Sequence, residues 1–216
     1  MTEVGLAVFG DVVGSRLDGR AATAWLRGLV DELGEAYAGQ TLAPFGFTQG
    51  DELQGLLGLD ADPLEAVFRA ALREQPNPPE MRWVVAAGPV EPGEGPATER
   101  TGTAFFAARD LSGLARRRRD RLLVRSGDPE ADALLDDVAP LLGVLLGGLT
   151  DRQRLVGRLL LVDGLRQSEV ADRLDIARPT VSVVAERAHV RDLERLRHAI
   201  VSLVRTGVER TAGAAA

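Results

Sequence analysis

The sequence contains no cysteine, which excludes a disulfide framework and thiolate zinc sites. It also contains no lysine, so all 26 basic residues are arginine. The longest apolar run, Leu141 to Leu146, is far too short to span a bilayer, and no N-terminal signal segment is visible. We therefore expect a cytoplasmic protein with no membrane partner.

The charge is distributed unevenly along a chain of 216 residues, of which 27% are charged and 45% hydrophobic. This composition is typical of a globular protein and not of a disordered one. Residues 1–146 carry 14 arginines against 23 acids, a net charge of −9, whereas residues 147–216 carry 12 against 9, a net charge of +3. The acidic excess argues against broad nucleic-acid binding by the first part, and the second part is compatible with it.

Hydrophobic periodicity in the first part alternates between the strand and helix repeats. The expected elements are a strand (4–9), a helix (21–37), a hairpin (42–59), a helix starting at 62–63, a strand (82–87), a surface loop (88–102), a helix (103–117) and a strand (122–124). This order predicts an α+β fold of the ferredoxin-like type, with helices on one face of an antiparallel sheet.

Acidic residues follow glycines at two places in this pattern. Asp11 ends the first strand, and the Gly50-Asp51-Glu52 segment lies at the tip of the hairpin. Because neighbouring carboxylates repel each other, such a cluster favours a divalent cation. We expect Asp11 and Asp51 to meet across adjacent strands as a metal pair, with the Gly14-Ser15 turn beside them for phosphates. The alternative is that both aspartates are ordinary polar residues of strand ends and turns.

Three segments also resemble known nucleotide-converting enzymes. Residues Phe9 to Ser15 resemble the first metal motif of class III nucleotide cyclases, and Gly50 to Leu53 resemble the hairpin of GGDEF-type dinucleotide cyclases. Gly102 to Arg109 resemble the cyclase helix that ends in an alanine pair and an arginine. Together, the first ~125 residues are most similar to SatD-type bacterial proteins, a branch of the cyclase palm fold.

The resemblance implies Mg²⁺ held by Asp11 and Asp51, and a purine nucleotide such as ATP or GTP as the ligand. The nucleotide-binding residues that it implies are Val12, Val13, Gly14, Ser15, Arg16, Gly50 and Arg109. Phe47 stands where cyclases place a base-reading lysine, and Phe105 where they place a transition-state asparagine. Loss of such a donor lowers the rate by ~10²–10³, so the sequence leans against an enzyme.

Arginines also gather at the end of the helix expected to start at Thr103. Arg116 to Arg119 suit the negative end of that helix dipole, so we expect a solvated helix end in preference to a phosphate or DNA patch. Arg109 is equally compatible with an ion pair on the helix surface.

The C-terminal part has the apolar spacing of a helix-turn-helix. Thr150 and Gln153 form a capping box, Ser168 is expected to cap a second helix, and a third begins near Arg178-Pro179. The run from Leu149 to Val184 resembles the DNA-binding regions of LuxR-type regulators and sigma-factor region four, except that Asp175 stands where the turn often has glycine. By analogy, the residues near DNA are Arg166, Gln167, Arg178, Thr180, Ser182, Val183 and Arg187. The alternative is a helical bundle used only for protein contacts.

The chain therefore divides into a cyclase-like palm (1–127), a helical linker (128–147), a helix-turn-helix domain with a long C-terminal helix (148–210) and a tail (211–216). The apolar stripe of that long helix, from Arg187 to Val208, either closes the module's own core or forms a dimer seam. His189 and His198 are expected at the surface.

Three functions remain open at this point. The first is a homodimeric regulator of transcription that binds double-stranded DNA and whose palm binds a nucleotide with Mg²⁺. The second is an active cyclase or nucleotidyltransferase with an accessory helical domain. The third is a degenerate palm that serves only as a dimerisation scaffold.

Overall fold

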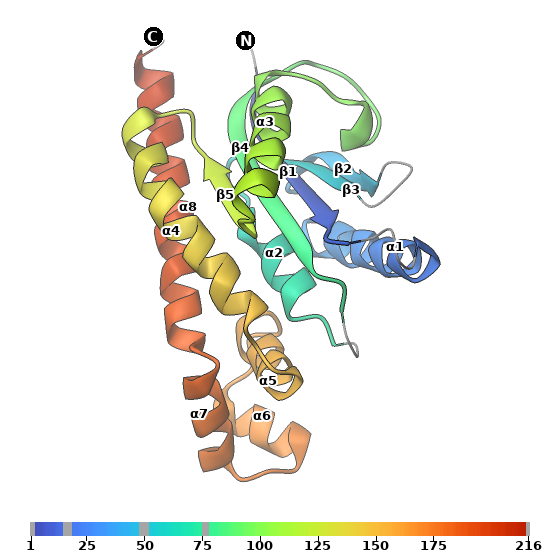
Figure 1. Cartoon of the computed structure of the whole chain (residues 1–216), viewed down its shortest axis with the longest axis vertical. Coiled ribbons are helices and arrows are strands. Elements are labelled where there is room, and N and C mark those ends of the chain that lie inside the picture. The colour runs from blue at the N-terminus through green and yellow to red at the C-terminus, as the bar shows by residue number, and fades with distance from the viewer. Residues whose placement is uncertain (1–2, 15–18, 48–51, 75–77, 215–216) are drawn as a thin grey trace.

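The computed structural model describes residues 3–14, 19–47, 52–74 and 78–214, in which five strands form one sheet (Figure 1). The strand order is β2-β3-β1-β4-β5, and the strands are β1 (Glu3–Val12), β2 (Thr41–Phe47), β3 (Glu52–Leu57), β4 (Met81–Val90) and β5 (Leu122–Arg125). β1 lies at the centre and is antiparallel to both β3 and β4, whereas β5 runs parallel to β4. The first four strands thus have the ferredoxin-like arrangement, and β5 extends it.

The sheet is covered by helices on both faces, so the expectation of a single covered face is wrong. Three helices belong to this part of the chain: α1 (Gly19–Ala36), α2 (Leu64–Ala71) and α3 (Thr103–Arg118). α1 and α2 pack on the face that carries Leu6 and Val8, and α3 packs on the face that carries Ala7 and Phe9. Successive residues of a strand point to opposite faces, and the central strands are apolar at both sets of positions.

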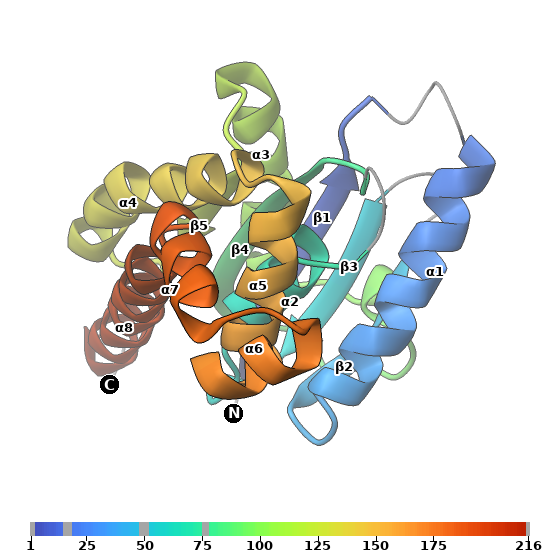
Figure 2. The ribbon, with the colours of Figure 1, turned by 90° about the horizontal axis from the view of Figure 1, so that it is seen from below.

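Two helices that follow β5 in the sequence flank the β5 edge of the sheet. α4 (Pro129–Gly147) packs along β5, and α8 (Val190–Ala214) packs along α4 (Figures 1 and 2). Leu193, Ile200 and Val204 of α8 lie in the same hydrophobic core as α1 and α2. The buried stripe of α8 therefore closes the core of the first domain, and not the module's own core, which was one of the two roles left open by the sequence. The helix continues to Ala214, past its predicted end at Val208 and into the expected tail.

The helix-turn-helix forms a separate small core at one end of the molecule (Figure 1). It comprises α5 (Asp151–Leu161), α6 (Gln167–Leu174) and α7 (Arg178–Arg187), which bury Val156, Leu159, Val170, Ala171, Val181 and Ala185 against one another. Asp175 adopts the left-handed conformation, with φ 50°, that glycine often supplies in this turn. The described chain is therefore α+β, with a ferredoxin-like sheet in the first part and an all-α module of three helices in the C-terminal part.

Capping explains the start of two of these helices. Gln153 Oε1 accepts a hydrogen bond from Thr150 N at 2.8 Å, which confirms the capping box at α5. α6 begins two residues earlier than expected, because Glu169, and not Ser168, caps it: its carboxylate accepts from Arg166 N at 2.6 Å. Between α7 and α8, His189 has a φ of 53°, which breaks the single helix predicted from Arg187 to Val208.

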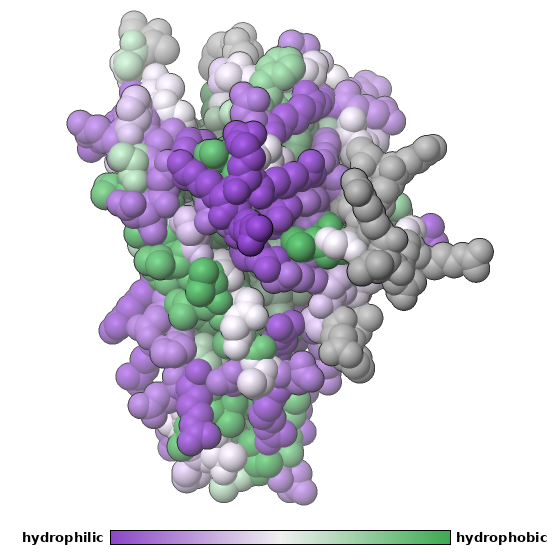
Figure 3. Space-filling model, in the orientation of Figure 1, coloured by the Kyte–Doolittle hydropathy of each residue, from purple (hydrophilic) through white to green (hydrophobic). Residues whose placement is uncertain are grey.

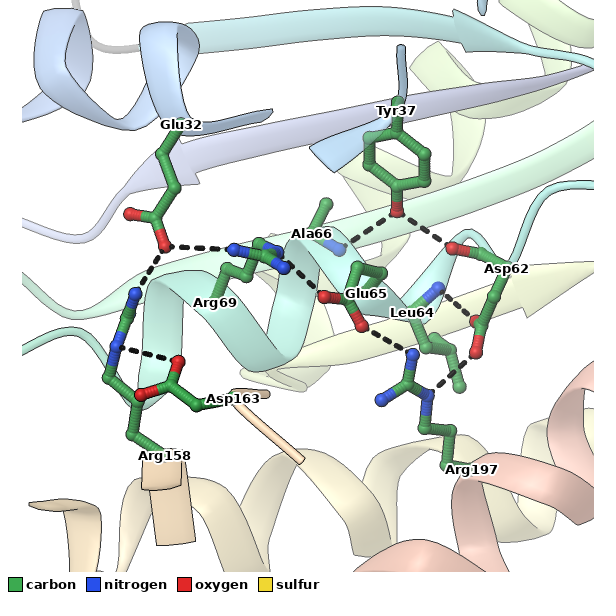
Figure 4. A network of polar contacts seen from close by, with 10 residues as sticks. All are labelled: Glu32, Tyr37, Asp62, Leu64, Glu65, Ala66, Arg69, Arg158, Asp163 and Arg197. Atoms are coloured by element: carbon green, nitrogen blue, oxygen red, sulfur yellow. Dashed lines mark hydrogen bonds and ion pairs between the residues drawn. The ribbon is translucent and has the colours of Figure 1, made fainter. Parts of the chain in front are cut away.

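A network of polar side chains joins the palm to the C-terminal helices (Figure 4). Arg197 of α8 donates to Asp62 Oδ2 at 2.6 Å and to Glu65 Oε2 at 2.5 Å, at the start of α2. Burial alone lowers the pKa of Arg197, but the two carboxylates outweigh it and raise that pKa. The Tyr37 hydroxyl donates to Asp62 O at 2.7 Å and accepts from Ala66 N at 2.9 Å.

Across the described part of the chain, no helix is both long and apolar enough to cross a bilayer.

Candidate functional sites

Asp11 lies near the C-terminal end of the central strand β1, on the face of the sheet covered by α3. It is the last residue but one of β1, and the strand register places it opposite Glu52 of β3 and Arg82 of β4. Two carboxylates and a guanidinium therefore meet on three adjacent strands. Glu52 also accepts a hydrogen bond from Gln54 Nε2 at 2.6 Å.

Arginines already balance these carboxylates. Arg82 Nη1 lies 3.0 Å from Asp11 Oδ2, and both side chains are mostly buried, with exposed fractions of 12% and 13%. Arg116 comes from α3, and its guanidinium lies 3.5 Å from Asp11 and 3.8 Å from Glu52. We call the group Asp11, Glu52, Arg82 and Arg116 the edge cluster. Its mixture of carboxylates and guanidiniums matches the two halves of a metal-bound phosphate: oxygens for the cation and nitrogens for the anion.

Much of the predicted nucleotide site lies outside the described residues, namely Ser15, Arg16, Gly50 and Asp51. Within the described ranges, no group of three or more acidic or histidine residues is arranged to hold a metal ion. The pairing of Asp11 with Asp51 therefore stays a prediction.

Gly10 and Gly14 of the first motif are required for different structural reasons. Gly14 has a φ of 76°, and nothing lies within 4 Å of a Cβ added there, so its turn needs glycine for conformation. Gly10 has no such conformation; an added Cβ would lie 2.8 Å from the Trp83 ring and 2.9 Å from Met81 Cε. Gly10 is thus required by packing against β4. Val12 is buried, and Val13 N donates to Glu80 O at 2.7 Å.

Arg109, which the resemblance places near phosphates, lies away from the edge cluster. It is exposed on α3, and its guanidinium stacks 5.7 Å from the centroid of the Phe106 ring. Arg116 lies two turns further along the same face of α3, roughly 10 Å along the axis, and it contacts Asp11. Sequence reasoning assigned Arg116 to a solvated helix end and missed Arg82. The seven-residue spacing from Arg109 and the strand pairing of Arg82 are the signals that would find them.

Of the two phenylalanines at cyclase positions, Phe105 is part of the core packing. Phe105 is fully buried between α3 and the sheet, with its ring centroid 5.8 Å from that of Phe9. Phe47 ends β2 opposite Leu53 and is half-buried. An apolar ring that faces the core supplies no donor to a reacting phosphate.

The second candidate site is the outer face of α7. Val181 and Ala185 are buried against α5 and α6, so the opposite side of α7 faces solvent. The residues predicted to read DNA from this helix are all exposed: Arg178, Thr180, Ser182, Val183 and Arg187. Arg166 is exposed and Gln167 half-exposed at the N-terminus of α6. The arrangement leaves the outer face of α7 uncovered at one end of the molecule (Figure 2).

Comparison with known proteins reveals distant similarity in structure only. No protein-family model matches the chain, and no curated protein is similar to it. One similar structure is that of a bacterial light-regulated adenylyl cyclase, at 14% identity and a TM-score of 0.41, over 57% of this chain and 76% of that one. A second such cyclase structure has 14% identity and a TM-score of 0.40, over 57% and 43%. A regulator of polyketide synthase expression from Bifidobacterium adolescentis has 17% identity and a TM-score of 0.25, over 98% and 82%.

Proposed function

We propose that the protein is a DNA-binding regulator of transcription whose palm domain binds a purine nucleotide together with Mg²⁺. The observation that carries the DNA-binding part is the uncovered recognition helix α7, which presents Arg178, Thr180 and Ser182 on a module with its own core. Arginine and hydroxyl side chains at the start of a recognition helix are the groups that reach base edges in the major groove. Arg166 at the N-cap of α6 is suited to a backbone phosphate.

Selection of bound duplexes from a random DNA library, followed by fluorescence anisotropy on the enriched sequence, tests this proposal. Arg178→Ala should weaken specific binding about 10- to 100-fold, because one base contact is worth ~1–3 kcal/mol. Arg27→Ala is the matched control, since Arg27 is an exposed arginine on α1. Absence of any enriched sequence, or equal affinity of the two variants, would remove DNA reading by α7.

The edge cluster supports the nucleotide part. Asp11 and Glu52 offer the oxygen ligands that Mg²⁺ prefers, and Arg82 and Arg116 offer donors for phosphate oxygens. When bound, Mg²⁺ would neutralise phosphate charge. Arg82 and Arg116, which now pair with the carboxylates, would instead pair with the phosphates of the nucleotide. Nucleotide binding would therefore change the ionic partners of both arginines.

Thermal unfolding with ATP and GTP, each with and without Mg²⁺, tests the nucleotide site. A stabilisation that requires Mg²⁺ is expected, and Arg116→Gln should reduce it while Arg117→Gln, its exposed neighbour on α3, leaves it unchanged. A shift that is the same in both variants would place the nucleotide elsewhere. In the same samples, any cyclic product above background would favour the alternative function of an active cyclase.

A homodimer is part of the proposal, and the outer face of α4 supports it. Leu134, Leu141 and Val144 lie on the side of α4 that faces away from the core, and Val138 and Leu145 border this side, partly buried against the core. Leu134, Leu141 and Val144 are 53%, 55% and 67% exposed, and Figure 3 shows hydrophobic side chains gathered over α4. An apolar helix face of this kind can pack against the same face of a second copy of the chain.

Two copies would present two recognition helices to paired half-sites. Analytical ultracentrifugation should show a dimer that Leu141→Glu converts to a monomer. Phe106→Glu, at an equally exposed position on α3, should leave the dimer intact. A monomeric native chain would remove this part of the proposal.

A further inference from the structure

A cavity of about 150 Å³ lies between the palm and the C-terminal helices, away from the edge cluster. Its walls come from α2, the start of β4, α4 and α5, which meet in the lower half of Figure 1. Met81 and Trp83 line it, and they point to the face of the sheet that α2 covers. Arg82, between them in sequence, points to the other face and belongs to the edge cluster. The cavity is therefore a different site from the one proposed for the nucleotide.

Most of the cavity wall is apolar. Val67 and Ala71 of α2, Leu146 of α4, and the side chains of Met81 and Trp83 form one continuous hydrophobic surface. An apolar cavity of this volume is large enough for a six-membered ring. The flat indole of Trp83, which is almost fully buried, offers an aromatic face to such a ring.

The polar part of the wall carries an unmatched positive charge. Arg121 pairs with Glu80 through Nη2, but its Nη1 is buried and has no hydrogen-bond partner among the described residues. Arg154 also lines the cavity; its Nε donates to Leu149 O at 3.1 Å, and within the described ranges it makes no ion pair. Two guanidiniums thus face one carboxylate, and a buried charged donor without a partner is costly.

We infer that this cavity binds a small carboxylic acid with an apolar, ring-sized body. The carboxylate would accept hydrogen bonds from the Arg154 guanidinium, and the nearby Arg121 guanidinium would add positive charge, which completes the charge balance of the wall. The ring would lie against Trp83 and Met81.

Calorimetric titration of the full chain with benzoate tests the inference, with benzamide as the neutral molecule of the same shape. Benzoate should bind, and benzamide should bind at least tenfold more weakly because it has no charge for the arginines. Benzoate should also change the fluorescence of Trp83, measured as the part of the change that persists in a Trp25→Phe background. Equal binding of the two compounds, or binding of inorganic phosphate with the same affinity as benzoate, would overturn the assignment.

Two variants locate the site. Arg154→Gln should weaken benzoate at least tenfold, whereas Arg152→Gln, an exposed arginine on the same helix, should not. Ala71→Leu should abolish binding by filling the cavity, and its circular dichroism and melting temperature would show that the chain is folded. Benzoate binding that survives both Arg154→Gln and Ala71→Leu would show that the ligand lies elsewhere.

Discussion

Arg158 of α5 lies with its Nη2 atom 2.8 Å from Glu32 Oε1 of α1, although the two residues are 126 positions apart in sequence. Both side chains are largely buried, with exposed fractions of 19% and 17%. The same carboxylate lies 3.3 Å from Arg69 and 3.5 Å from Arg73. Glu32 thus contacts three arginines. Its pair with Arg158 ties the helix-turn-helix to the palm (Figure 4).

Replacing Glu32 with glutamine should destabilise the protein strongly. The substitution keeps the shape but removes a charge that three guanidiniums contact, although Arg69 keeps Glu65 and Arg158 keeps Asp163 as a second partner. A broken buried pair costs ~3–5 kcal/mol. Because the pair is partly exposed, we expect the free energy of unfolding to fall by ~2–4 kcal/mol, measured by urea denaturation. Glu35→Gln, an exposed change on the same helix, should stay within ~0.5 kcal/mol of the native chain. Equal effects of the two variants would refute the role of Glu32.

Stability should fall at alkaline pH because of Tyr37. Burial raises the pKa of Tyr37 above its ordinary value, and the Asp62 and Glu65 carboxylates add to this, against the hydrogen bond from Ala66 N, which lowers it. The unfolded chain loses this proton above about pH 10, whereas the folded chain keeps it. The stabilisation is therefore fully present below that pH and is lost as pH rises, at ~1.4 kcal/mol per pH unit.

The ionisation of Tyr37 can be followed without interference from other side chains. Tyr37 is the only tyrosine, and the chain has no lysine or cysteine that would titrate in the same range. Tyrosinate absorbance should appear only together with the loss of helical circular dichroism. Tyr37→Phe should flatten the pH profile, and tyrosinate absorbance from a chain that is still folded would contradict the assignment.

The Asp11–Arg82 pair should show strong coupling. Asp11→Asn leaves the mostly buried Arg82 without its 3.0 Å ionic contact, so we expect a loss of ~2–4 kcal/mol in the free energy of unfolding. The double variant with Arg82→Gln should recover part of this loss, because no uncompensated charge remains. Additive single effects in the double-mutant cycle would show that the two side chains do not interact.

Gly10 should resist substitution for reasons of packing. The added methyl of Gly10→Ala would lie 2.8 Å from the Trp83 ring, so the core must shift, at a cost of ~1–3 kcal/mol. Gly34→Ala is the matched control: nothing lies within 4 Å of its added Cβ on α1, and it should stabilise by ~0.4–1 kcal/mol. Chemical denaturation of the two variants should therefore give opposite signs.

The sequence predicted the elements that local signals define. The capping box could be predicted because Thr150 and Gln153 interact within one helical turn. The ferredoxin-like order could be predicted because strands and helices differ in the period of their hydrophobic residues. Gly14 could likewise be assigned to a turn, because its conformation is a local property.

Only tertiary packing determined which residues from distant segments of the chain contact one another. The sequence placed Arg116 in a run of arginines and gave Glu32 no role; only the folded chain brings the first to Asp11 and the second to Arg158. Folding also places α3 and α2 on opposite faces of the sheet, and this separates the edge cluster from the cavity at Arg121. Propensities and caps act over a few residues, whereas ion pairs and cavities depend on distances between segments that the chain brings together only on folding.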